Sequence, residues 1–418
     1  MRQHDRRLKI AIFLLTACSF HVQAQEQTTS RIFSAPEVRR ALEYLKATEP
    51  DTINDQIRAC EIPAPTFQEQ KRAEHFKQRF TEFGLKNVRI DGIGNVIGER
   101  PGAGGGPTLV LAAHLDTVFP EGTDVKVKRD GSVLSGPGIG DDSRGLGVIL
   151  AVARALNEAK IETRGTILFV ANVGEEGLGD LRGTRHLFNN ELKGKITHFI
   201  SVDGTGLGVT NTAVGVVRYR VTFRGSGGHS YGAFGLASPI HALGRAIEKI
   251  SRFQVPERPK TTFNVGRIEG GTSVNSIAHT AWMEIDMRSE SVTELAKLEA
   301  EFKRVTQIAL DEENARGEKK LTMEMKMVSQ RPAGVTPADS PIVKIAMAAN
   351  AAVGAETRLG SGSTDSNIPI SLGVPAITIS GGGVGRGAHS LDESFDTTDS
   401  HIGAQRALLT VLGIVGLR

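Results

Sequence analysis

The chain has 418 residues, of which 39% are hydrophobic and 23% charged, and it carries a formal net charge of +3. This length predicts two or more domains, and the composition is ordinary for a soluble protein, without repeats or low-complexity tracts. Its two cysteines, Cys18 and Cys60, exclude a disulfide framework, so a large hydrophobic core must stabilise the fold.

The N-terminus has the pattern of a secretory signal. Four basic residues precede the apolar stretch Ile10 to Phe20, and Val22-Gln23-Ala24 provides small residues for cleavage. We expect residues 1–24 to be a cleaved signal peptide and the mature protein to be periplasmic or secreted. In an alternative interpretation Cys18, in Leu-Thr-Ala-Cys, is the lipid anchor of a lipoprotein. The stretch is too short to span a membrane.

The positive charge belongs to this N-terminal segment. Four of the 50 basic residues and one of the 47 acidic residues lie in the first 24, which leaves 46 of each in the rest of the chain. A chain with equal numbers of basic and acidic residues gives no reason to expect a nucleic acid as partner.

In chain order, the first half alternates helices and strands. Helical periodicity marks residues 34–48, 68–83, 145–159 and 182–188. A strand pair covers residues 87–99, and apolar runs typical of buried strands lie at residues 108–113, 167–173 and 199–202. Strands that alternate with helices predict an α/β sheet.

The pattern changes after residue 212. Residues 217–223 alternate with period two, which is typical of a half-exposed antiparallel strand. The order β-α-β-β-α-β of a ferredoxin-like unit follows, at residues 217–223, 239–253, 261–267, 278–288, 292–314 and 321–328. We therefore expect a lid or dimerisation domain, residues 213–328, inserted into a catalytic domain of residues 25–212 and 329–418.

The last part of the chain returns to the catalytic domain. Its predicted elements are a helix at 341–352, a polar turn at 360–367, a strand at 374–380, a flexible glycine-rich loop at 381–389 and a helix at 398–417.

Ionisable side chains follow the ends of the predicted buried strands. His114 follows residues 108–113, the pair Glu175 and Glu176 follows residues 167–173, and Asp203 follows residues 199–202. His389 comes after the strand at 374–380. Ligands of α/β sheets gather beyond the carboxyl ends of the strands, so we expect these side chains to meet at one edge.

Histidine and carboxylate ligands without cysteine suit zinc, with cobalt or manganese as substitutes. A site for two metal ions, which activates water and holds a tetrahedral intermediate, needs about five protein ligands and a general base. The chain offers five candidate ligands, namely His114, Asp141, Glu176, Asp203 and His389. Glu175 remains as the candidate base.

Six short motifs resemble one known family. They are His-Leu-Asp-Thr at 114–117, Gly-Pro-Gly-Ile-Gly-Asp-Asp at 136–142, Gly-Glu-Glu-Gly at 174–177, Val-Asp-Gly at 202–204, Gly-Gly-His-Ser at 227–230 and Ala-His-Ser at 388–390. Their order is that of the co-catalytic zinc metallopeptidases, which include aminoacylase, carboxypeptidase G, peptidase T and succinyl-diaminopimelate desuccinylase. The resemblance covers nearly all of the mature chain.

The resemblance implies a role for each candidate residue. Asp141 would bridge two zinc ions, with His114 and Asp203 completing one site and Glu176 and His389 the other. Glu175 would be the general base. Asp116 would hold the His114 imidazole in the ligating tautomer, and the Asp141–Asp142 peptide would be cis.

The resemblance also implies substrate-binding residues in the inserted domain, namely His229, Asn275 and Arg288. In many relatives this domain forms a homodimer, and its histidine reaches the partner's active site. Asp203 stands where the deacylases and carboxypeptidases have Glu, which favours a di- or tripeptidase or aminopeptidase. The alternatives are a glutamate-type carboxypeptidase, an N-acyl-amino-acid amidohydrolase, and an inactive peptide- or metal-binding protein.

Overall fold

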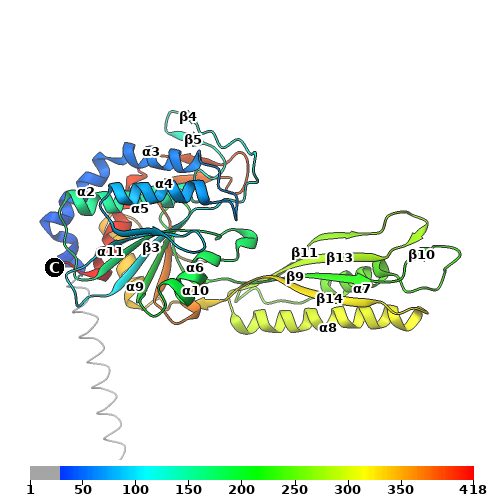
Figure 1. The fold of residues 1–418 in the computed structure, drawn as a ribbon. Coiled ribbons are helices and arrows are strands. Elements are labelled where there is room, and N and C mark those ends of the chain that lie inside the picture. Colours follow the sequence, from blue (N-terminus) through cyan, green and yellow to red (C-terminus); the bar gives the residue numbers. More distant parts are fainter. Residues whose placement is uncertain (1–28) are drawn as a thin grey trace, which may run out of the picture.

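The structure, a computed structural model, describes residues 29–418 (Figure 1). The expected signal peptide, residues 1–24, and Cys18 lie outside the described residues. Within them, a nine-stranded mixed sheet forms the main body. No described helix is both long and apolar enough to cross a membrane.

The central strands of the large sheet run parallel. Their order is β6 (Thr166–Asn172), β3 (Thr108–His114), β7 (His198–Val202) and β17 (Ala376–Ile379). Antiparallel strands extend the sheet beyond β6, namely β2 (Val96–Arg100) and β1 (Lys86–Ile90). Beyond β17 lies β8 (Val209–Ala213), which pairs with β15 (Gly334–Val335) and β16 (Leu359–Gly362). Because the central strands are parallel, their carboxyl ends share one edge.

Helices cover both faces of the large sheet. The sequence of β3 is therefore apolar on both of its sides. Leu109 and Leu111 pack into one core and Val110 and Ala112 into the other, because successive side chains point to opposite faces. The first core includes residues of α2 (Pro36–Ala47), α4 (Gln70–Glu82), α5 (Ser143–Glu158), α9 (Pro341–Ala352) and α11 (His401–Val415). The second includes Leu181, which directly precedes α6 (Arg182–His186), and residues of a π-helical turn at Leu187–Glu191 and of α10 (Asn367–Ser371).

One helix was not predicted. α3 (Glu49–Cys60) follows α2 after Thr48 alone, and Pro50 occupies its first turn. Proline in the interior of a helix breaks the helix, but in the first turn it is favoured, because the N–H that it lacks would have no partner there. Pro50 therefore marks the start of a second helix as well as the end of the first.

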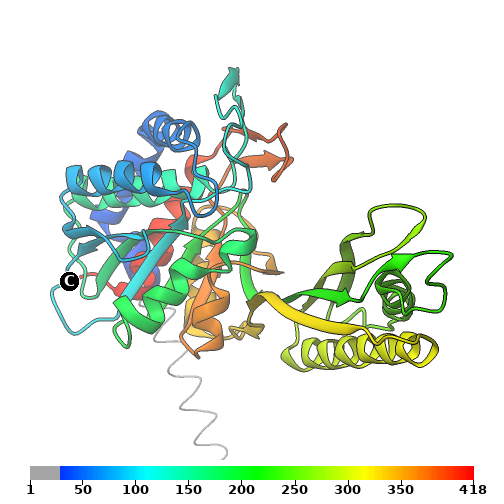
Figure 2. The ribbon, with the colours of Figure 1, turned by 45° about the vertical axis from the view of Figure 1, so that its right-hand side comes forward.

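A second, smaller sheet extends away from the main body (Figure 2). Its order is β11 (Thr261–Gly270), β13 (Thr280–Ser289), β9 (Gly215–Arg224) and β14 (Thr322–Arg331), all antiparallel. The helices α7 (Pro239–Ser251) and α8 (Val292–Arg316) pack on this sheet around a separate core. β13 alternates buried and partly exposed residues over its whole length, as a sheet with one covered face requires. We call this unit the second layer.

A third, four-stranded sheet corrects one prediction. The expected flexible loop at 381–389 contains β18 (Val384–Arg386), which pairs with β19 (Ser394–Asp396). β19 in turn pairs with β5 (Val133–Ser135), and β5 with β4 (Lys128–Asp130). The glycines of this segment favour a loop locally, but main-chain pairing with a distant strand orders it.

Candidate metal centre

The carboxyl edge of the large sheet brings the predicted ligands together. His114 is the last residue of β3, Asp203 directly follows β7, and the pair Glu175 and Glu176 follows β6. His389 lies between β18 and β19. Three groups of side chains have ligand atoms within 4.8 Å of one another, namely His114, Asp141 and Asp203; Asp141, Glu176 and His389; and His114, Glu175 and Glu176.

Asp141 stands between two histidines. Its Oδ1 lies 3.0 Å from Nε2 of His114, and its Oδ2 lies 3.1 Å from Nε2 of His389. The same nitrogen of His389 lies 2.9 Å from Oε1 of Glu176. Each oxygen of Asp141 therefore faces a different histidine, which is the arrangement that a carboxylate bridging two metal ions requires.

Glu393 holds the loop that carries Asp141. Its carboxylate accepts hydrogen bonds from the main-chain N–H groups of Gly138 at 2.9 Å, Gly140 at 2.7 Å and Asp141 at 3.0 Å. Because Glu393 directly precedes β19, the pairing of β19 with β5 aligns the loops of Asp141 and His389. The sequence contains no motif that marks Glu393, and we did not predict this role.

Asp142 connects β3 to the start of α5. Its Oδ2 accepts the main-chain N–H of His114 at 3.0 Å, and its Oδ1 accepts that of Gly145 at 3.1 Å as the N-cap. The peptide between Asp141 and Asp142 is cis, as the resemblance implies. Asp142 thus faces the helix while Asp141 faces the two histidines.

Asp116 organises the glutamate pair more than the histidine. Its two carboxylate oxygens accept the main-chain N–H groups of Glu175 at 2.9 Å and Glu176 at 3.0 Å, and Thr66 donates to it at 2.9 Å. The Nδ1 of His114 lies 3.0 Å from the main-chain carbonyl of Asp116 but 3.6 Å from its carboxylate. The contact that selects the tautomer with Nε2 free is therefore made by the main chain of Asp116.

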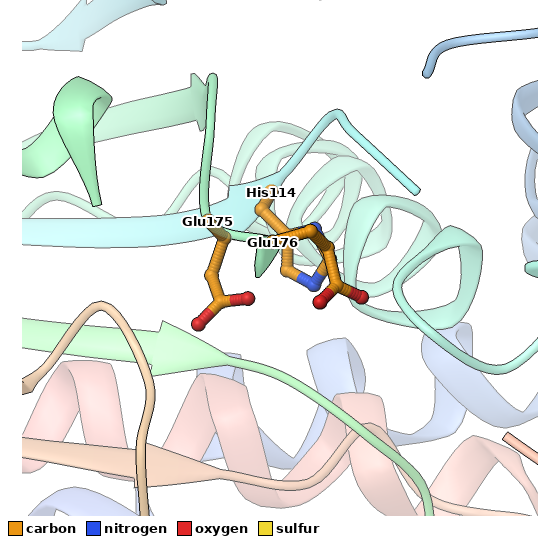
Figure 3. A group of neighbouring side chains, drawn as sticks. All are labelled: His114, Glu175 and Glu176. Carbon is orange, nitrogen blue, oxygen red and sulfur yellow. The ribbon is translucent and has the colours of Figure 1, made fainter. Parts of the chain in front are cut away.

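The two glutamates diverge. Figure 3 shows the Glu176 carboxylate beside the His114 ring, whereas the Glu175 carboxylate points in another direction. The Oε1 of Glu175 accepts a hydrogen bond from Nη1 of Arg331 at 3.0 Å. Both glutamates are buried, at 5% and 6% exposure. Their positions match separate roles, one toward the ligand group and one toward a cationic side chain.

The electrostatics of the cluster favour a bound cation. Burial and the nearby Asp141 carboxylate raise the pKa of Asp203 to about 7. Hydrogen bonds to Asp141 and Glu176 raise the pKa of His389 to about 10. Buried carboxylates this close repel one another, and divalent cations would remove that repulsion. The oxygen and imidazole donors, without a thiolate, fit zinc, cobalt or manganese.

The comparison with known protein families shows to which family the chain belongs. A model of the family described as "Peptidase family M20/M25/M40" matches residues 110–412, well over half of the chain and the whole span from His114 to His389. The chain belongs to this family. It is a metallopeptidase of the M20 family, and its clustered histidine and carboxylate side chains could hold metal ions.

Individual relatives agree with this assignment. Carboxypeptidase G2 of Pseudomonas sp. (strain RS-16) is 29% identical over 300 aligned residues, and the match covers 69% of this chain and 69% of that protein. A tripeptidase of Staphylococcus aureus has a TM-score of 0.73 at 23% identity and covers 87% of this chain and 97% of its own. A dinuclear metal-binding M20 peptidase of Bacillus subtilis has a TM-score of 0.67 at 19% identity, over 88% and 99% of the two chains. These structures share the fold of this chain.

Two predicted substrate residues of this M20 peptidase do not join the metal ligands within the chain. His229 and Asn275 are exposed, and β10 (Gly228–His229) pairs with β12 (Ser276–Ile277). Figure 1 shows β10 at the end of the second layer, far from β3. Arg288, on β13, lies closer to the main body, where it lines a cavity of about 300 Å³ with Ser361 and Ser363. The three predicted substrate-binding residues therefore lie apart, His229 and Asn275 at the far end of the second layer and Arg288 near the main body.

Sequence reasoning missed three buried charged residues around the centre. Besides Glu393 these are Arg331, which contacts Glu175, and Asp365, which accepts hydrogen bonds from Asn172 at 2.7 Å and Thr184 at 2.6 Å. None belongs to a motif that the resemblance rests on. What distinguishes these three residues is that their charged side chains are buried, and burial can be seen only in the folded chain.

Proposed function

We propose that this M20 peptidase is a secreted or periplasmic enzyme with two zinc ions that hydrolyses the amide bond of short peptides. The observation that carries the proposal is the placement of the two Asp141 oxygens against different histidines, with Glu176 and Asp203 completing the two ligand groups. A single zinc ion uses about four ligands, so five converging side chains favour a pair.

Two bound zinc ions would polarise the scissile carbonyl and make water a better nucleophile. The residues of the chain supply the rest. Glu175 accepts the proton of the attacking water and passes it to the leaving amine. Its position within 4.8 Å of His114 and Glu176 would also permit metal ligation. We assign it the base because it is left over from the two groups of ligands that share Asp141, and because Arg331 already holds its Oε1.

The proposed substrate class has two kinds of support. The S. aureus tripeptidase fold and Asp203 support a di- or tripeptidase or aminopeptidase. One observation favours the second candidate, a carboxypeptidase or N-acyl-amino-acid amidohydrolase. Lys260, Arg288 and Glu290 line the same cavity as Ser361 and Ser363. Arg288 is paired with Asp286 at 2.7 Å, and the two cations beside the single carboxylate of Glu290 would suit a substrate carboxylate.

One experiment separates these substrates. The zinc-loaded enzyme is assayed on free, N-acetylated and C-amidated forms of the same dipeptide. Loss of hydrolysis on acetylation identifies an aminopeptidase or dipeptidase, and loss on amidation identifies a carboxypeptidase. No hydrolysis of any form, with zinc shown to be bound, would contradict the proposed function.

The proposal also includes export and a homodimer. Export is supported by the predicted signal peptide, and the mass of the mature N-terminus distinguishes cleavage after Ala24 from lipidation of Cys18. The homodimer is supported by large exposed apolar side chains near His229, namely Tyr231 at 89%, Phe234 at 87% and Val274 at 102% exposure. A second copy would bring His229 to its metal centre if its own carboxyl sheet edge covered this surface.

A further inference from the structure

Arg331 lies where the chain returns from the second layer to the main body. It is the last residue of β14 and only 5% exposed. Its Nη1 donates to Oε1 of Glu175 at 3.0 Å and to Oγ of Ser363 at 3.3 Å, and its Nη2 donates to the main-chain carbonyl of Glu175. One guanidinium therefore holds both the carboxylate and the main chain of the proposed base.

Further contacts join the same two segments. Oδ1 of Asp180 accepts hydrogen bonds from Oγ of Ser329 at 2.6 Å and from the main-chain N–H of Gln330 at 3.0 Å. Arg185 donates to the main-chain carbonyl of Asp180 at 2.9 Å and also to that of Gln330. Residues 175–185, which follow β6, are thus fastened to residues 329–331 of β14. We call this set of contacts the β14 clamp.

We propose that Arg331 is a positioning residue for Glu175 and that the β14 clamp makes the orientation of Glu175 depend on the position of the second layer. This inference rests on the proposed role of Glu175 as the general base. The planar fork of arginine fixes direction as well as distance, because its donors are held in one plane. A second layer that moves on β14 carries Arg331 with it, and Glu175 follows through two hydrogen bonds.

The geometry requires such a support. Glu176, the next residue, faces His389 at 2.9 Å, while Glu175 points elsewhere (Figure 3). Asp116 fixes the N–H groups of both glutamates but touches neither carboxylate of the pair by a hydrogen bond. Arg331 is the side chain that fixes the carboxylate of Glu175 among the hydrogen bonds of the described residues.

The first test does not depend on activity. In metal-free protein, urea midpoints are measured for Arg331→Met, Glu175→Gln and the double variant. A direct pair predicts a double variant at least as stable as Arg331→Met, because Glu175→Gln then removes an unpaired buried carboxylate instead of breaking a contact. Additive losses would overturn the pairing. The outcome is informative even if the enzyme hydrolyses no peptide, so it separates this inference from the proposed function.

The second test measures kinetics at full zinc occupancy. Arg331→Met is expected to lower kcat about 10²-fold with KM nearly unchanged, since a misplacement of about 1 Å costs that much. Arg331→Lys should recover part of the loss. Neither substitution should lower kcat further in a Glu175→Gln background. Arg406→Lys, which alters another buried arginine, bonded to Gly208 and Asn350, is the control for lost stability and should keep kcat.

The third test concerns the link to the second layer. Asp180 touches Ser329 and Gln330 but has no hydrogen bond to Glu175 among the described contacts. Asp180→Ala is therefore expected to lower kcat several-fold, on the order of 10, through the clamp alone. It should have no effect in the Glu175→Gln background. An unchanged kcat in Asp180→Ala would overturn the link, and an unchanged kcat in Arg331→Met would overturn the positioning role.

Discussion

One carboxylate oxygen of Asp116 accepts the main-chain N–H of Glu175 at 2.9 Å, which ties the loop after β3 to the loop after β6. Asp116→Asn removes one of the two acceptors and places an amide N–H₂ against a main-chain N–H. We expect activity or metal affinity to fall about 10–100-fold, as for other groups that orient ligands. Steady-state kinetics and zinc titration check this. Full activity and unchanged zinc affinity would show that these hydrogen bonds of Asp116 are not needed to orient the glutamates.

The metal content should be about two zinc ions per chain. The five ligands converge in two groups that share Asp141, and one zinc ion would leave one group unused. Elemental analysis after removal by chelator and mild reconstitution measures the stoichiometry, and activity is followed at each addition. A single tight ion, with no activity gained from a second, would contradict the dinuclear site.

The two adjacent glutamates should respond differently to the same change. Glu175→Gln keeps its shape but accepts no proton, so we expect turnover to fall roughly 10²–10⁴-fold with both metal ions retained. Glu176→Gln should instead weaken metal binding, because Glu176 faces His389 at 2.9 Å. The two variants control for each other. Equal loss of metal in both would show that the assigned roles are wrong.

Metal binding should become stronger as pH rises from 6 to 8. In the metal-free chain the pKa of Asp203 is raised to about 7 and that of His389 to about 10, so both release protons when they bind metal. Their raised pKa values also stabilise the metal-free fold at low pH. This stability is lost between about 3.8 and 7 for Asp203 and between about 6.5 and 10 for His389. Calorimetry in buffers of different ionisation enthalpy measures the protons released on metal binding. A zinc affinity that does not change between pH 6 and 8 would contradict this prediction.

His229 should act on the active site of the other subunit. Glu175→Gln and His229→Ala, each inactive alone, should regain activity when mixed and allowed to exchange subunits, because a mixed dimer holds one complete site. His241→Ala, in the same layer, is the control and should stay active alone. No recovery despite proven exchange would place His229 outside catalysis or within its own chain's site.

Local sequence patterns determined much of the large sheet. The apolar runs that became β3, β6 and β7 end within three residues of His114, Glu175 and Asp203, because a buried strand must give way to polar residues where the core ends. Long helices rich in apolar residues, such as α5 and α11, were predicted to within a few residues. α3 was missed because proline stands both after helices and in their first turn, so Pro50 by itself does not show that a second helix begins.

The sequence by itself therefore determined which residue types stand at the ends of which strands. Only the tertiary structure decided how they meet. Asp141 reaches His389 across 248 positions because β19 pairs with β5 and Glu393 holds the intervening loop. The distance of β10 from the centre and the contact of Arg331 with Glu175 likewise depend on packing between remote segments. No local periodicity records such contacts, since they are set by burial and hydrogen bonding that exist only once the layers have packed.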